Sequence, residues 1–182
     1  NAVLPAACAA RGLTGFRMLD CCLGALAQML PDHCIAASDG GNTGISIGGY
    51  DAQRRPFIYV DFVCSAWGGR PWDDGIDGAA SMFANVATQS AEGCEREQPV
   101  ETLRIEFIED SAGPGRHRGG AGIRRDYRLL EEEAILQVRA DRITTQPSGL
   151  HGGGPGQAGR NHLNPDGPAA EPLPGKFIRT LR

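Results

Sequence analysis

Two long glycine-rich segments constrain the fold of this chain more than any other feature. They are EDSAGPGRHRGGAGIRRDYR (residues 109–128) and PSGLHGGGPGQAGRNHLNPDG (residues 147–167). Glycine disfavours the interior of helices and strands because it loses the most backbone freedom on folding. The chain holds 26 glycines and 12 prolines in 182 residues, a share below that typical of disordered low-complexity sequence. The sequence therefore predicts a folded protein with long loops between short regular elements.

The clearest helical pattern runs from residue 14 to residue 30. Four leucines, from Leu19 to Leu30, recur at helical spacing and form one apolar face. Thr14 is suited to cap the N-terminus of this helix. Pro31 follows the last leucine and is expected to end it.

Apolar and alternating runs predict several strands. The clearest are GISIGGY, RPFIYVDFVCSAW, PVETLRIEFIED and the closing GKFIRTLR, and the second is apolar enough for the interior of a sheet. GIRRDYRLL and EEAILQVRADR indicate a hairpin around residues 131–133, and residues 79–88 indicate a short helix. We therefore expect a single α+β domain over residues 1–182. It would hold a β-rich mixed sheet, one long N-terminal helix and long glycine-rich loops.

The charged residues exclude some classes of function. The net charge is −4, which argues against a nucleic-acid-binding protein, and no apolar run is long enough to span a membrane. Lys176 is the only lysine, so the other cationic side chains are arginines, which suit paired contacts with carboxylate or phosphate. The six cysteines include no C-x-x-C pair, and reduced thiols in a cytoplasmic protein are expected.

The first glycine-rich segment has three open interpretations: it cradles a phosphate, holds a carboxylate, or only turns a corner. It lacks the G-K-[ST] ending of a phosphate-binding P-loop. In the second segment GPGQAG (residues 154–159) matches G-x-G-x-x-G, but no strand before it or helix after it is indicated, as a dinucleotide site requires.

Arg116 and Arg118 are the candidate anion-binding side chains of the first segment. In an extended stretch they point the same way, and two neighbouring guanidinium groups call for an anion between them. An internal carboxylate from Asp110 or Asp141 is the favoured anion, with a substrate carboxylate or phosphate as the alternative. The neighbouring Arg142 completes this set of candidates.

The scattered histidines predict no metal site in this chain. His33, His117, His151 and His162 form no H-x-x-x-H or H-x-H pair. No G-x-S-x-G nucleophile elbow is present either, so no catalytic residue is assigned from the sequence.

Several segments together resemble one protein family. They are RGLTGFRMLDCCLGALAQMLPD, RPFIYVDFVCSAWGGRPWDDGIDG, EREQPVETLRIEFIEDSAGPGRHRGGAGIRRDYRLL and RADRITTQPSGLHGGGPGQAGRNHLNPDG. In this order they are similar to the C-terminal part of the B-type subunits of hydantoinases, 5-oxoprolinases and acetone carboxylases. The family's N-terminal half has no counterpart here, so the chain resembles a fragment.

The resemblance implies an ATP-dependent hydrolase of cyclic amides. A separate hydantoinase A-like subunit would bind ATP and Mg²⁺ and phosphorylate the substrate, so a hetero-oligomer is implied. A metal site is implied only for the family's N-terminal half, and no cofactor is expected in this chain. Two alternatives stay open: a subunit of a ketone carboxylase, or a non-catalytic assembly module.

Overall fold

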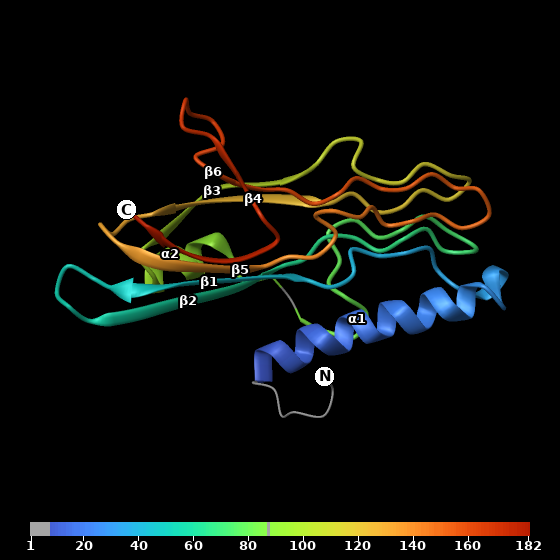
Figure 1. Cartoon of the computed structure of the whole chain (residues 1–182), viewed down its shortest axis with the longest axis horizontal. Coiled ribbons are helices and arrows are strands. Elements are labelled where there is room, and N and C mark those ends of the chain that lie inside the picture. The colour runs from blue at the N-terminus through green and yellow to red at the C-terminus, as the bar shows by residue number, and fades with distance from the viewer. Residues whose placement is uncertain (1–7, 87) are drawn as a thin grey trace.

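A computed structural model of the chain describes residues 8–86 and 88–182, and the side chains from residue 12 onward. Strands lie together at one end of the molecule, and long loops extend beside the first helix at the other (Figure 1). The elements are α1 (Cys8–Ala27), η1 (Pro31–His33), β1 (Thr43–Tyr50), β2 (Pro56–Val63), α2 (Ala91–Glu97), β3 (Val100–Phe107), β4 (Ile123–Leu129), β5 (Ala134–Arg139), β6 (Asn161–Leu163), β7 (Glu171–Leu173) and β8 (Lys176–Leu181). The predicted α+β, β-rich class is confirmed.

Four strands form the larger sheet in the order β2-β1-β5-β8, and all three pairings are antiparallel. The prediction that β2 lies inside a sheet is wrong, because β1 is its one neighbour among the described strands. Although β2 is an edge strand, it carries apolar side chains on both faces. Tyr59 and Asp61 point into the core, whereas Ile58 and Val60 are exposed on the other face.

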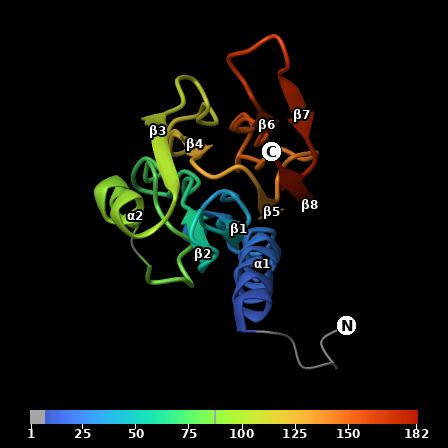
Figure 2. The ribbon, with the colours of Figure 1, turned by 90° about the vertical axis from the view of Figure 1, so that its left-hand side faces the viewer.

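β3 and β4 form a second antiparallel layer above this sheet (Figures 1 and 2). The expected hairpin between β4 and β5 is wrong, because β4 pairs with β3 while β5 pairs with β1 and β8. Residues 131–133 therefore carry the chain from one layer to the other. Alternation within each segment predicted both strands, but it holds no information about which strand each one pairs with.

The long helix is confirmed in part. It begins at Cys8, before the expected cap at Thr14, and ends at Ala27. The short helix expected over residues 79–88 is wrong within the described part of that range, since residue 87 lies outside it. A helix follows at α2 instead, where the Ser90 side chain accepts a hydrogen bond from the N–H of Gly93. No helix in the described ranges has the length and apolar character needed to cross a membrane.

The two layers enclose a core cluster of buried side chains. It consists of Ile47, Tyr59, Cys94, Val100 and Ala134, from β1, β2, α2, β3 and β5. Because every one of these elements contributes one residue to the cluster, it joins both layers and the short helix into one unit.

A buried ion pair also joins the layers. Asp61 of β2 pairs with Arg125 of β4 and accepts a hydrogen bond from the Tyr127 hydroxyl, and both charged side chains are almost fully buried. The N–H of Phe62 donates to the second oxygen of the Asp61 carboxylate at 2.8 Å. Tyr127 packs edge-on against Tyr59 with ring centroids 5.8 Å apart. Burial, and then the hydrogen bond to Asp61, raise the pKa of Tyr127 above its usual value.

Replacing Arg125 with Met is expected to lower the free energy of unfolding by about 3–5 kcal/mol, because it leaves Asp61 buried without a counter-charge. Urea unfolding measures the change. Arg128→Met is the matched control, since Arg128 pairs with Glu101 at the surface of the same strand pair and an exposed pair contributes only about 0–1 kcal/mol. Equal losses in the two variants would contradict this role of the buried pair.

The loops pack backbone against backbone, and glycine makes this possible. A Cβ atom at Gly120 would lie 2.1 Å from the carbonyl oxygen of Ile76, and one at Gly68 would lie 2.1 Å from that of Ala36. Neither position tolerates a side chain, because the neighbouring atoms belong to the backbone. The high glycine content is thus a requirement of close packing between loops.

Gly120→Ala is accordingly expected to lower the free energy of unfolding by roughly 1–3 kcal/mol through steric overlap. Gly24→Ala serves as its control, because no atom lies within 4 Å of the added methyl group and alanine favours an exposed helix position by about 1 kcal/mol. Thermal unfolding of both variants checks the prediction. A Gly120→Ala protein as stable as the parent would show that the loops are not closely packed.

Candidate functional site

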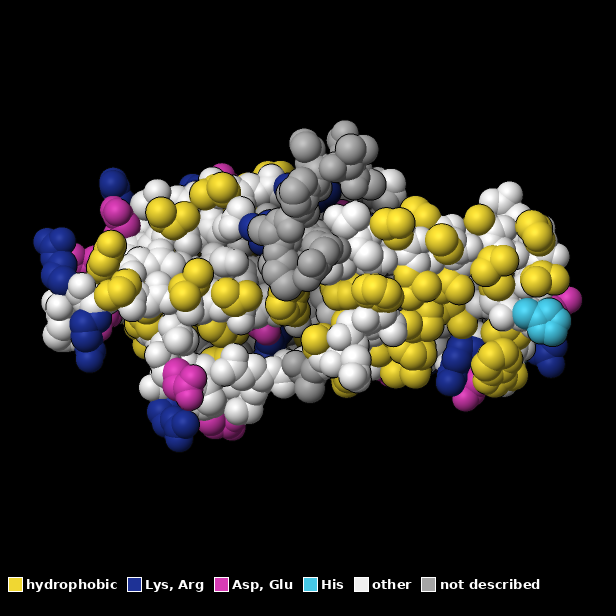
Figure 3. All heavy atoms as spheres, turned by 90° about the horizontal axis from the view of Figure 1, so that it is seen from below, with side chains coloured by type: hydrophobic (Ala, Val, Ile, Leu, Met, Phe, Trp, Pro, Cys, Tyr) yellow, Lys and Arg dark blue, Asp and Glu magenta, His cyan; other side chains and the backbone are white. Residues whose placement is uncertain are grey.

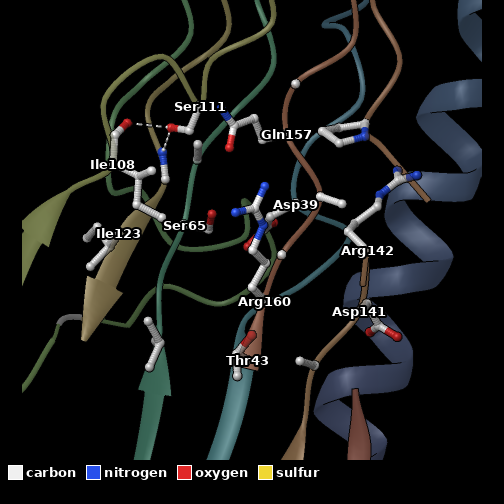
Figure 4. A pocket seen from close by; sticks show the side chains of 18 of the residues that line it. Asp39, Thr43, Ser65, Ile108, Ser111, Ile123, Asp141, Arg142, Gln157 and Arg160 are labelled. Atoms are coloured by element: carbon white, nitrogen blue, oxygen red, sulfur yellow. Dashed lines mark hydrogen bonds between the residues drawn. The ribbon is translucent and has the colours of Figure 1, made fainter. Parts of the chain in front are cut away.

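A cavity of about 1740 Å³ lies where the strands end and the loops begin. β1 starts and β2 ends at its wall, with Thr43 and Val63 among the lining residues, and β4 starts there at Ile123. The two glycine-rich segments line other parts of the wall, together with residues from 31–41, 65–71 and 173–182. Figure 4 shows polar side chains from these separate segments around one space.

The glycine-rich segments bind each other by main-chain hydrogen bonds. The N–H groups of Gly154 and Gln157 donate to the carbonyl oxygens of Pro114 and Ser111, at 2.7 and 2.9 Å. Those N–H groups are therefore unavailable to a phosphate. This geometry does not fit a nucleotide-binding loop, and it identifies residues 109–122 as a corner that forms one wall of the cavity.

Arg118 pairs with an internal carboxylate, although not with either of the expected ones. Its guanidinium donates to both oxygens of Asp77, at 2.7 and 3.1 Å, and lies 3.7 Å from Asp74. The Arg118 guanidinium, and then the N–H of Ala121, hold the pKa of Asp77 below its usual value. The pair is partly exposed, so its role is to fasten the corner to residues 74–77 and not to neutralise a buried charge.

Asp110 and Arg116 are exposed and do not meet Arg118 as the sequence suggested. Asp110 adopts a positive φ of 52°, and its carbonyl oxygen accepts a hydrogen bond from the Gln157 side chain. Arg116 lies within 4 Å of no carboxylate in the described part of the chain. Of the two, Arg116 lines the cavity and Asp110 does not, and their proposed anion-binding role stays a prediction.

Asp141 and Arg142 lie on the other side of the cavity, next to α1. Arg142 pairs with Asp20 of α1 at 2.8 Å, and Asp141 pairs with Arg17 of α1 and with Lys176. Both candidates thus anchor the long helix to the cavity wall.

Asp39, which the sequence analysis did not identify, lies in the same part of the wall. Its N–H donates to the carbonyl oxygen of Ala66, and one of its carboxylate oxygens is buried without a hydrogen-bond partner. Burial raises the pKa of Asp39 to about 7, and the neighbouring Asp20 carboxylate adds to this, while the N–H of Gly41 and the Arg142 charge act in the opposite direction. Asp39 is therefore a carboxyl group that is neutral in mildly acidic solution.

The sequence analysis also missed Arg160, which differs from most arginines of the cavity because no described carboxylate pairs with it. Nine arginines line the cavity, and seven of them pair with carboxylates: Arg70, Arg124, Arg125, Arg128, Arg142, Arg179 and Arg182. Within residues 12–86 and 88–182, Arg116 and Arg160 have no such partner. Figure 4 shows the Arg160 side chain reaching into the middle of the cavity. The only sequence signal was its place directly after a glycine-rich run.

The cavity wall combines apolar and glycine residues with arginines, of which Arg116 and Arg160 lack a described carboxylate partner and could hold a small anion. No group of three or more histidine, cysteine or acidic side chains in the described ranges could bind a metal ion. The one lysine is engaged with Asp141. The geometry supports binding and orientation of a ligand, and it assigns no nucleophile.

Comparison with known proteins shows which chains share this sequence. A protein of Methanocaldococcus jannaschii is 36% identical over 163 residues, which cover 90% of this chain and 28% of that protein. A protein of Pseudomonas sp. strain NS671, named as the B-type subunit of a D-/L-hydantoinase, is 30% identical over 159 residues, which cover 87% of this chain and 26% of the relative. The chain therefore spans roughly a quarter of the length of these relatives.

The solved structure of nucleotide-free acetone carboxylase shares the fold. It superimposes with a TM-score of 0.56 and 19% identity, over 71% of this chain and 17% of that one. The sequence profile of the Hydantoinase B/oxoprolinase family matches residues 1–181, which is nearly the whole chain. The chain belongs to the hydantoinase B/oxoprolinase family.

Proposed function

We propose that the chain is part of the B-type subunit of an ATP-dependent enzyme that hydrolyses a five-membered cyclic amide. The observation that carries this proposal is the family match over residues 1–181. Both reactions in the family's name, and the hydantoinase among the relatives, concern cyclic amides. The acetone carboxylase structure is less than 25% identical, so it supports a shared fold and not a shared substrate.

In this proposal the cavity holds the activated ring and a partner subunit supplies ATP. Phosphorylation of an amide oxygen creates a better leaving group and an anionic intermediate, which suits a site lined with arginine. ATP and Mg²⁺ are not assigned to this chain, because the main-chain N–H groups of Gly154 and Gln157 donate to the first glycine-rich segment, and those of Gly119 and Gly120 donate to the carbonyl oxygens of Gly113 and Trp67. An A-type subunit is the proposed place for both.

Exposed apolar side chains support an assembly with other subunits or with further parts of a longer chain. Met18, Leu26, Met29 and Leu30 of α1 and the following turn are 44–73% exposed. Figure 3 shows hydrophobic side chains gathered on this lower face of the molecule. A soluble protein rarely leaves such a surface uncovered. This is also the observation that favours the second candidate, a non-catalytic assembly module.

The reconstituted pair of A-type and B-type subunits is expected to turn over hydantoin or 5-oxoproline with ATP consumption. Acetone with bicarbonate is the comparison substrate, and ATP hydrolysis with product formation is measured for all three. If acetone with bicarbonate is the only substrate that is turned over, the proposed reaction is ketone carboxylation and not hydrolysis. Normal turnover by a pair in which Arg160 and Asp39 are both replaced would instead support the assembly module.

The raised pKa of Asp39 predicts weaker binding of anions as the pH rises through about 7. Ionisation then adds a negative charge beside Asp20, Asp141 and Arg142, and a unit charge a few ångströms away changes affinity by on the order of 3–10-fold. The product inhibition constant of the reconstituted enzyme, measured at about pH 6 and about pH 8, checks this.

Asp39→Asn is the control, and it should remove the pH dependence of the product inhibition constant. The proton held by folded Asp39 stabilises the fold below about pH 4, and that contribution is lost as the pH rises to about 7. The variant should therefore gain stability relative to the parent progressively between about pH 4 and about pH 7 and keep that gain at higher pH. A pH dependence that persists in the variant would assign it to another group.

A further inference from the structure

We propose that Arg160 binds the oxyanion of a small-molecule ligand inside the cavity. The oxyanion is either the carboxylate formed when a cyclic amide opens or a phosphoryl group on the activated ring. Hydrolysis breaks the ring C–N bond and adds water, so it leaves a carboxylate and an N–H group on one molecule, an amine from a lactam or a urea from a hydantoin. This inference deepens the proposed function and rests on it for the identity of the ligand.

The charge balance of the cavity wall points to Arg160. Seven of the nine lining arginines are already neutralised by carboxylates of the chain, as described above. Arg160 is not, although carboxylates from Asp39 and Asp141 line the same cavity. A guanidinium presented to a partly enclosed space without a counter-charge attracts an anion and forms paired hydrogen bonds with a carboxylate or phosphate.

The backbone on both sides of Arg160 is held in place. The N–H of Gly159 donates to the carbonyl oxygen of Arg142 at 2.9 Å, and the Asn161 side chain donates to the carbonyl oxygen of Pro174 at 3.0 Å. Asn161 also begins strand β6. Binding of a ligand therefore costs little ordering of the main chain, which favours affinity.

The surroundings of Arg160 suit a polar small molecule. The hydroxyls of Ser65 and Thr43 and the carboxyl of Asp39 lie around the same space (Figure 4). A neutral Asp39 does not repel an oxyanion, and the positive charge of Arg142 lies near it. The cavity volume of about 1740 Å³ leaves ample room for a five-membered ring and its opened product.

Arg116 provides the matched control because it is the other cavity arginine without a described carboxylate partner. Arg116 and Arg160 are both exposed and line the cavity, but Arg116 lies between Gly115 and His117 on the first glycine-rich segment. A general attraction of anions by positive charge would involve both residues, whereas a built site would involve Arg160 alone.

The test is calorimetric titration of the intact protein that carries this sequence. The probes are N-carbamoylglycine and 6-aminohexanoate, which are opened cyclic amides, together with 6-aminohexanamide and inorganic phosphate. Arg160→Gln is expected to weaken carboxylate binding roughly 10–100-fold, since a charged hydrogen-bonding pair is lost. Arg160→Lys should lose less carboxylate affinity than Arg160→Gln, and Arg116→Gln should change the dissociation constant less than about twofold. Thermal melting should show the Gln variant as stable as the parent, because Arg160 makes no described side-chain contact.

The outcomes separate the two sources of the oxyanion. Carboxylate binding that phosphate does not displace identifies the opened product, and displacement by phosphate identifies a phosphoryl group. The site is overturned if the parent protein binds none of the anions, if 6-aminohexanamide binds as well as the acid, or if Arg116→Gln weakens binding as much as Arg160→Gln. Binding requires neither ATP nor a second subunit, so a lack of turnover would count against the proposed function and not against this site.

Discussion

The buried contact between Asp61, Arg125 and Tyr127 is the interaction on which the arrangement of the two layers depends. It connects β2 of the larger sheet to β4 of the smaller one, and the core cluster around Tyr59 and Val100 lies beside it. Removing two charges from water is costly, and the pair offsets this cost because each charge neutralises the other and the Tyr127 hydroxyl and the N–H of Phe62 donate to the Asp61 carboxylate. The Nε of Arg125 stays buried without a hydrogen-bond partner. Since β2 and β4 both meet the cavity wall at one end, the contact also fixes the distance across the cavity.

Close packing of loop backbones is the second constraint, and it explains how a glycine-rich chain holds a defined cavity. Positions such as Gly120 and Gly113 sit against carbonyl oxygens of neighbouring segments, where a side chain would overlap. Main-chain hydrogen bonds then join the two glycine-rich segments. The first segment contributes carbonyl oxygens to these bonds, and its own N–H groups at Gly119, Gly120 and Ala121 donate to Gly113, Trp67 and Asp77. Those N–H groups are therefore unavailable to a phosphate, which argues against the phosphate-cradle interpretation. What remains for a ligand is a set of side chains, among which Arg160 and Arg116 are the arginines that no described carboxylate neutralises.

Local patterns in the sequence predicted most of the individual elements. Alternation identified β1, β3 and β8, and leucine spacing identified most of α1, because these signals depend on residues close in the chain. The errors concern which strands pair with each other and which charged side chains form ion pairs. β4 and β5 look like a hairpin, yet they lie in different layers, and the apolar run of β2 lies at an edge. Arg118 was expected to meet Asp110 or Asp141 and meets Asp77 instead. Asp39 and Arg160 carried no local pattern, so the sequence predicted Asp141 and Arg142 of the cavity wall but not these two residues.

The sequence by itself determined the class of fold, the turn-rich loops, the scarcity of lysine and the membership in the hydantoinase B/oxoprolinase family. These follow from composition, periodicity and the order of motifs, which need no knowledge of which residues touch. Only the tertiary structure decided which carboxylate neutralises which arginine, because residues 61 and 125 or 20 and 142 meet through the pairing of distant strands and the docking of α1. The lack of a described carboxylate partner at Arg160 therefore results from the whole fold and cannot be predicted from any single segment.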